Sequence, residues 1–272
     1  MIEAKSEAAI GQAASFVLVM TSDEGYEWQT SFSIPVGQIN HRAPTGPDGY
    51  GYYAYDNSDT DYPLAAPIYD WVTCSPTYGG AGTPLLLTDN TLVTVDLPFT
   101  FVYYGQSYDQ MVVSDNGWVS FDTAHYHDFY NWAMPNPYGN AAQISPFWDN
   151  LDPDREIDES TAADGIFFFH DAVNHRVLVE WSRLPNVRTE HDDLQTFQLV
   201  LYDPAHPDSS LVTPTGDGIV EVQYRQIVND DYARMFATVG IEDDSEAIGL
   251  QYTYANLYAE GAAPLSAGLV IR

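Results

Sequence analysis

The residues best suited to chemistry are closely spaced acidic and amide side chains, and the first group is the run Asp56-Asn57-Ser58-Asp59-Thr60-Asp61. Oxygen ligands at this spacing can surround a hard cation such as Ca²⁺ at ~2.3–2.6 Å. The run lacks the glycine and the closing glutamate that an EF-hand loop requires. The pattern therefore predicts a calcium site with Asp56, Asp59 and Asp61 as ligands, and a solvated turn rich in Asp and Asn is the alternative.

A second acidic stretch follows the apolar residues Pro146-Phe147-Trp148. Its Asp and Asn side chains can close tight turns by themselves, so a structural role is one interpretation. Because the same oxygens suit Ca²⁺, the stretch also predicts Asp149, Asp152 and Asp154 as metal ligands.

Aromatic residues are frequent in segments that have the composition of loops, and they include Tyr53, Tyr126, Tyr130 and Trp132. Exposed rings of this kind can stack on sugars or on another protein. Large rings also cover the open ends of a sandwich, and this packing role is the favoured interpretation. The four residues remain candidates for ligand binding.

The candidate catalytic residues in the sequence do not form a complete known motif. His125 and His127 alternate as in cupin-type metal strands, but no glutamate follows at the required distance, so surface histidines are favoured. Cys74, the one cysteine, lies in Thr-Cys-Ser-Pro, where no neighbouring cation lowers the pKa of its thiol, so we expect a small buried hydrophobe. The sequence contains no Gly-x-Ser-x-Gly elbow, His-Glu-x-x-His helix or phosphate-binding glycine loop. We therefore expect no enzymatic activity and keep a hydrolase as the least favoured class.

The charge and composition of the chain limit the classes of binding partner that it can have. Asp and Glu number 39 against 9 Lys and Arg, which gives a net charge of −30. Such a chain repels phosphate backbones and anionic membranes, whereas divalent cations and a saline or cell-surface environment are compatible with it. Apolar residues make up 45% of the chain, which is enough for a folded core, and no apolar run approaches the ~18 residues of a membrane span.

The sequence pattern of the N-terminal part predicts a β-hairpin. Runs rich in β-forming residues at 15–20 and 28–36 flank Ser22-Asp23-Glu24-Gly25, which has turn composition. A lone hairpin is marginally stable, so we expect it to pack on another domain or on a second copy of the chain. We assign residues 1–37 to this element, 38–50 to a linker rich in proline and glycine, and 51–272 to the main domain.

The sequence pattern of the main domain predicts an all-β fold. Short runs of Val, Ile, Phe, Tyr and Thr alternate with turn residues, and the runs at 176–181 and 196–202 each have one more apolar face. We expect an antiparallel, jelly-roll-like β-sandwich with long loops. The predicted strands are 69–73, 93–97, 100–103, 110–114, 118–121, 165–170, 176–181, 196–202, 219–224, 238–241 and 269–271.

Several sequence blocks occur in the order found in nidogen-like extracellular domains. They are residues 97–108, residues 112–121, Pro146-Phe147-Trp148-Asp149, Val179-Glu180-Trp181 and Phe197-Gln198-Leu199. Over residues 95–245 the chain resembles that family, and more closely the accessory regions of bacterial secreted proteins that carry gingipain-type or subtilisin-type peptidases. In that setting residues 1–37 resemble the end of an immunoglobulin-like domain.

The resemblance implies secretion to the medium or the cell surface, with adhesion or scaffolding as the function, and it is compatible with Ca²⁺. It transfers no catalytic residues. The start of the sequence lacks the features of a signal peptide, so we expect a fragment of a larger secreted protein. The expected partners are other domains of that protein or other copies of the chain, with glycans if the domain is a carbohydrate-binding module; neither nucleic acid binding nor membrane insertion is expected.

Overall fold

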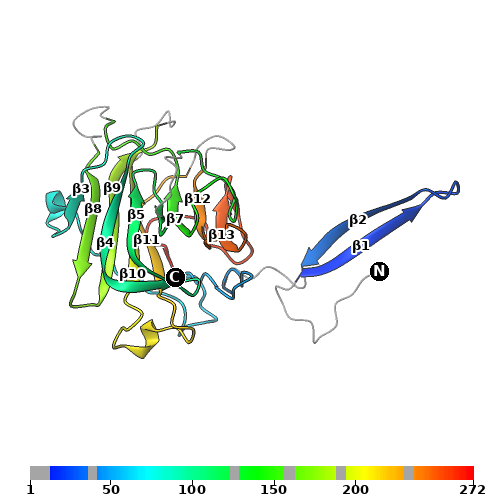
Figure 1. Ribbon diagram of the computed structural model, residues 1–272, viewed down its shortest axis with the longest axis horizontal. Coiled ribbons are helices and arrows are strands. Elements are labelled where there is room, and N and C mark those ends of the chain that lie inside the picture. The colour runs from blue at the N-terminus through cyan, green and yellow to red at the C-terminus, as the bar shows by residue number, and fades with distance from the viewer. Residues whose placement is uncertain (1–12, 36–41, 123–128, 156–162, 188–193, 230–235) are drawn as a thin grey trace. The chain divides into compact units, whose positions relative to one another are not determined.

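The computed structural model describes residues 13–35, 42–122, 129–155, 163–187, 194–229 and 236–272 (Figure 1). The chain forms two compact units, residues 1–41 and residues 42–272, and each is described by itself. The boundary falls inside the segment that the sequence assigns to a linker. None of the described helices is long and apolar enough to cross a membrane.

The first unit is the expected hairpin. Strands β1 (Ala13–Thr21) and β2 (Glu27–Pro35) pair antiparallel without a break in register, from Ala13 opposite Pro35 to Thr21 opposite Glu27. The turn is closed by a hydrogen bond from the Ser22 amide to the Tyr26 carbonyl (2.8 Å), and Gly25 supplies a positive φ of 83°. Glycine is suited to this conformation because it has no Cβ.

The second unit is an antiparallel β-sandwich, which confirms the predicted fold class. One sheet has the strand order β15-β11-β10-β9-β8-β3 and the other has the order β14-β13-β12-β7-β6-β5-β4. Two short 3₁₀ helices, η1 (Pro76–Tyr78) and η2 (Ser209–Leu211), lie in the connections. The strands are β3 (Thr83–Leu85), β4 (Leu92–Tyr103), β5 (Gln106–Ser114), β6 (Val119–Ser120), β7 (Gln143–Trp148), β8 (Gly165–Asp171), β9 (Arg176–Pro185), β10 (Leu194–Tyr202), β11 (Val220–Gln226), β12 (Thr238–Glu242), β13 (Gly249–Tyr254), β14 (Leu257–Tyr258) and β15 (Val270–Ile271).

The core lies between the two sheets because successive side chains of a strand point to opposite faces. In β9 the side chains of Val177, Val179 and Trp181 belong to the main core, which strands of both sheets build. The Trp181 ring stacks on Phe197 with the ring centroids 5.0 Å apart, and its Nε1 donates to the Ser114 carbonyl of the other sheet (2.8 Å). A polar tip on a large buried ring is thereby satisfied, as buried tryptophans require.

The outer face of the six-stranded sheet is covered by the segment that leads into η1, and this corrects one prediction. Residues 69–73 form no strand. They cross the sheet as an extended strap held by side chains: the Asp70 amide donates to Gln223 Oε1 (3.0 Å), and the Arg225 guanidinium lies 5.7 Å from the centre of the Trp71 ring. The aromatic run is therefore a cover for the sheet and not part of its ladder.

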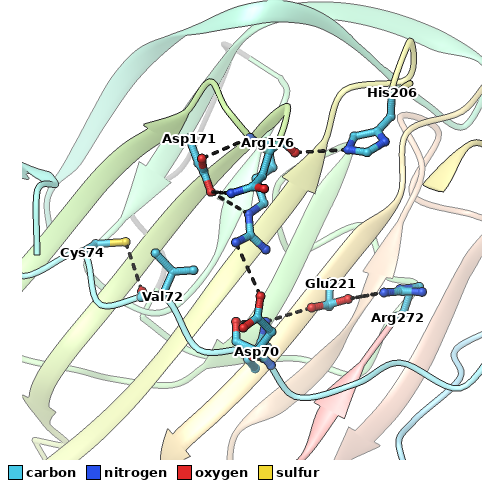
Figure 2. Close-up of polar contacts among 10 residues, drawn as sticks. Asp70, Val72, Cys74, Asp171, Arg176, His206, Glu221 and Arg272 are labelled. Atoms are coloured by element: carbon cyan, nitrogen blue, oxygen red, sulfur yellow. Dashed lines mark hydrogen bonds and ion pairs between the residues drawn. The ribbon is translucent and has the colours of Figure 1, made fainter. Parts of the chain in front are cut away.

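Under the strap lies a second, smaller core with charged neighbours (Figure 2). Cys74 is fully buried there, as expected, and burial raises the pKa of its thiol well above the ordinary value. Arg176 pairs with Asp171 at 3.0 Å and approaches Asp70 at 3.7 Å, and Arg272 pairs with Glu221 at 2.9 Å. Scarce arginines thus neutralise carboxylates on this face.

Two predicted strands, 93–97 and 100–103, are parts of the single strand β4. The pairing with β5 shifts between Asp96 and Phe101, around Pro98. Proline has no amide hydrogen to donate to the ladder, which explains the interruption. Strands β3, β7, β13 and β14 were not expected from the sequence.

Candidate functional site

The first predicted calcium loop is organised around the buried Asp56 carboxylate. Its Oδ1 accepts from the Ser58 amide (2.7 Å) and hydroxyl (2.6 Å). Its Oδ2 accepts from the Tyr252 hydroxyl (2.7 Å) and the Ala263 amide (3.1 Å). Both oxygens are therefore engaged by protein donors, and Asp56 ties its own turn to β13 and to the segment before β15.

The other two predicted ligands of this loop differ from Asp56. Asp59 is fully buried; its Oδ2 accepts from the Asp56 amide (2.8 Å), and its Oδ1 has no hydrogen-bond partner among the described residues. Burial raises the pKa of the Asp59 carboxyl to about 6. Asp61 is exposed. The geometry is that of a turn closed by its own Asp side chains.

The second predicted calcium loop separates into two parts. The Asp149 carboxylate turns inward and accepts from Asn186 Nδ2 (2.6 Å) and from the Asn150 amide (2.8 Å). Asp152 accepts from the Asp154 amide (2.8 Å), and Asp154 in turn accepts from the Asp89 amide (3.1 Å). The structure thus brings Asp152 and Asp154 together with Asp89, a residue that the sequence did not indicate.

Asp89, Asp152 and Asp154 form what we call the acidic corner. Burial and repulsion from the Asp152 and Asp154 carboxylates raise the pKa of Asp89. Across the described parts of the chain, no three or more His, Cys, Asp or Glu side chains are arranged as a ready metal site. Calcium binding therefore stays a prediction, and a bound ion would have to draw these carboxylates closer together.

A buried pair next to the acidic corner was also missed from the sequence. Asp115 Oδ2 accepts from the Asn90 amide (2.9 Å), and Oδ1 accepts from the Thr91 amide (3.1 Å). Asn116 Oδ1 accepts from the Leu151 amide (3.0 Å). Burial raises the pKa of Asp115 to about 7. The Asp-Asn pair before Gly117 indicates only a turn, and its partners lie in distant segments, so local sequence could not reveal this role.

The aromatic candidates lie in different places. The Trp132 ring packs against Tyr138 with the centroids 5.2 Å apart, and both rings are exposed. Tyr130 is exposed beside Phe129 at 4.3 Å. Tyr126, like His125 and His127, lies outside the described residues. Trp132 and Tyr138 therefore supply an exposed aromatic pair, with Tyr138 not indicated by the sequence, and the exposed Tyr130 lies two residues before Trp132 in the chain.

A buried acid lies close to the segment that carries these rings. Glu242 in β12 accepts from the Asn136 amide at Oε2 (2.8 Å), and its Oε1 has no hydrogen-bond partner within the described chain. Burial raises the pKa of this carboxyl to about 8. At neutral pH the group is therefore largely protonated, unlike an ordinary glutamate.

Tyr53, the fourth aromatic candidate, lies at a different position, on the edge of a cavity of about 500 Å³. The walls come from β11 and β15 of one sheet and from β7, β12 and β13 of the other. The structure thus places the half-exposed Tyr53 at the edge of this cavity and not with the Trp132–Tyr138 pair.

Comparison with known proteins supports one family. No curated protein and no solved structure matches the chain. A family model described as NIDO related matches residues 68–266, which include the acidic corner and the strands of both sheets except β15. The chain therefore belongs to the family of nidogen-related domains.

Proposed function

We propose that the chain is a non-catalytic scaffold or adhesion module of a larger secreted or cell-surface protein. Nidogen-related domains are of an extracellular type, and we place this chain within a bacterial multidomain protein. The observation that carries the proposal is the β1–β2 hairpin, which presents apolar side chains to solvent. Val17, Val19 and Trp28 are 65%, 49% and 58% exposed.

The hairpin has the properties of a joining element. Leu18 and Met20 alternate with Val17 and Val19 along β1, so apolar groups are exposed on both of its faces. An isolated two-stranded sheet is at best marginally stable, and exposed apolar patches of this kind mark interaction sites. Strand addition to its open edges would complete a larger sheet with a neighbouring domain or with a second copy.

The test measures association of the full chain. Light scattering across a wide concentration range should show a mass that rises with concentration, and Val17→Thr with Val19→Thr should abolish the rise. Threonine keeps the strand propensity while removing apolar surface. Val173→Thr, at an exposed position of the main domain, is the matched control. A strict monomer at every concentration would reject the second copy as partner.

Carbohydrate binding is the second candidate, and the exposed Trp132–Tyr138 pair favours it. Retention on insoluble polysaccharides should fall in Trp132→Ala and in Tyr130→Ala if the aromatic surface binds sugar. Tyr78→Ala removes an equally exposed ring elsewhere and serves as the control. Equal retention of all variants would reject this surface as a sugar site.

A further inference from the structure

The cavity between the two sheets has the size and the surface of a small-molecule site. Its volume of about 500 Å³ lies within the ~300–1,000 Å³ typical of such sites. Protein interiors are packed like organic crystals and seldom leave spaces larger than a water molecule. The space opens to solvent at its edge, and a recess of this size between two sheets is more than the packing of a core requires.

The sheets line the cavity mainly with aliphatic side chains, and the loops at its edge add tyrosines, serines and threonines. Val220 and Val222 of β11 face Val239 and Ile241 of β12 across the space, with Ile144 of β7 and Leu250 of β13 beside them. Arg272 is the one charged residue among the described lining residues, and its side chain is held by Glu221 on the outer face of the sheet through Nε (3.1 Å) and Nη2 (2.9 Å). The walls thus offer dispersion and apolar burial but no unpaired charge.

Buried carboxylates outside the cavity hold the hydroxyl groups of two of its tyrosines. The Tyr252 hydroxyl donates to Asp56 (2.7 Å). At the edge, the Tyr50 hydroxyl and the Thr215 hydroxyl donate to the same oxygen of Asp217, at 3.1 and 2.6 Å. These bonds engage the polar tips and brace the segments that frame the opening. The hydroxyl groups of Tyr50 and Tyr252 are thereby already engaged by protein acceptors.

From the shape, the walls and the bracing, we propose that this cavity binds an uncharged ligand with an aliphatic chain. The chain would lie between β11 and β12, and the polar end would lie at the opening, where Tyr53 is half exposed and Leu64 is fully exposed. A net charge of −30 repels an anionic head group. The chemical class is therefore that of neutral lipids such as fatty alcohols and monoacylglycerols.

The experiment uses the full chain and the uncharged fluorescent probe N-phenyl-1-naphthylamine. Saturable binding is expected, with displacement by monodecanoylglycerol and much weaker displacement by decanoate. Val220→Phe and Ile241→Phe fill the cavity from opposite sheets and should each weaken probe binding by about tenfold or more. Val173→Phe adds the same ring at an exposed turn and should leave binding unchanged.

Thermal unfolding separates loss of the site from loss of the fold. A side chain that enters existing space displaces few packed atoms, so the two filling variants should melt at or above the temperature of the unaltered chain. If one variant misfolds, the other, from the opposite sheet, still tests the cavity. The proposal is overturned if the unaltered chain shows no saturable probe binding, or if the folded filling variants bind as tightly as Val173→Phe does.

Discussion

Buried acidic residues act here mainly as hydrogen-bond acceptors that join distant segments. Asp56 joins its turn to β13, Asp115 receives the amides of Asn90 and Thr91, and Asp217 receives the Gly105 amide at 2.8 Å. An ionised carboxylate accepts strong, charge-assisted bonds. The price is desolvation, which raises the pKa of Asp115 to about 7 and that of Glu242 to about 8.

The elevated pKa of Glu242 predicts a pH-dependent stability. An unfolded glutamate titrates near 4.3, so between about pH 4.3 and pH 8 the folded chain binds more protons than the unfolded chain at this site. The contribution of Glu242 to stability is therefore greatest below that window and is lost as the pH rises through it. Glu242→Gln, which cannot ionise, should raise the melting temperature at pH 8.5 and leave it nearly unchanged at pH 4.

The control for this prediction is Glu260→Gln, which removes one negative charge from an exposed glutamate. It should change the melting temperature far less at pH 8.5. If Glu242→Gln and Glu260→Gln give the same small shift at both pH values, Glu242 ionises normally and the burial argument fails.

The positions of the important residues were easier to predict from the sequence than their partners. The Asp56 loop was singled out from the sequence as a calcium site, which stays a prediction, and local spacing could not show that Tyr252 and Ala263, about 200 positions away, provide hydrogen-bond donors to Asp56. In the same way, Asp89 joined Asp152 and Asp154 only through folding. The residue type determines which hydrogen bonds or ions a side chain can accept, and the tertiary fold determines which donors lie close to it.

At the level of elements, periodicity succeeded where one face of a strand is buried against the main core. Strands β9 and β10 contain the predicted ranges 176–181 and 196–202, because their side chains alternate between the two faces of the sheet, and both strands extend beyond the predicted ranges. The prediction for residues 69–73 was wrong because a β-forming composition also suits a strap that is held by side chains. Strand β13 was missed, and its run Gly249-Leu250-Gln251-Tyr252-Thr253-Tyr254 mixes polar and aromatic residues as the loops do.

The turn between β5 and β6 gives a prediction at this scale. Gly117 has a φ of 74°, and a Cβ placed there would lie 1.9 Å from the Phe147 carbonyl oxygen. Gly117→Ala should therefore combine backbone strain with a clash against β7, at a cost of about 3 kcal/mol or more of unfolding free energy. Urea denaturation measures the loss.

Gly216→Ala is a matched control, because Gly216 has a similar φ of 83° and no atom within 4 Å of the added carbon. Strain alone should cost about 1 kcal/mol there. The difference between the two variants isolates the close approach of the turn to β7. Equal losses would mean that the backbone at Gly117 moves freely away from Phe147.

For the whole molecule, the acidic excess has both a general and a local effect. A net charge of −30 destabilises any compact state through self-repulsion, so all salts should raise the melting temperature by screening. A calcium site would add stabilisation that depends on the identity of the ion, because ligand binding to the folded state shifts unfolding by mass action. Comparing ions at one ionic strength separates the two effects.

We predict that millimolar Ca²⁺ raises the melting temperature by several degrees more than Mg²⁺ does at equal ionic strength, and that EDTA removes the difference. Asp152→Asn and Asp154→Asn should abolish it, since these carboxylates share the acidic corner with Asp89. Asp244→Asn removes one exposed charge elsewhere and should preserve it. Equal effects of the two ions would assign the stabilisation to screening, and the acidic corner would then be a solvated turn.

A calcium effect that survives Asp152→Asn and Asp154→Asn but is lost in Asp59→Asn would instead place the site in the first acidic loop. Burial raises the pKa of the Asp59 carboxyl there to about 6, so calcium binding at this loop should weaken as the pH falls towards 6.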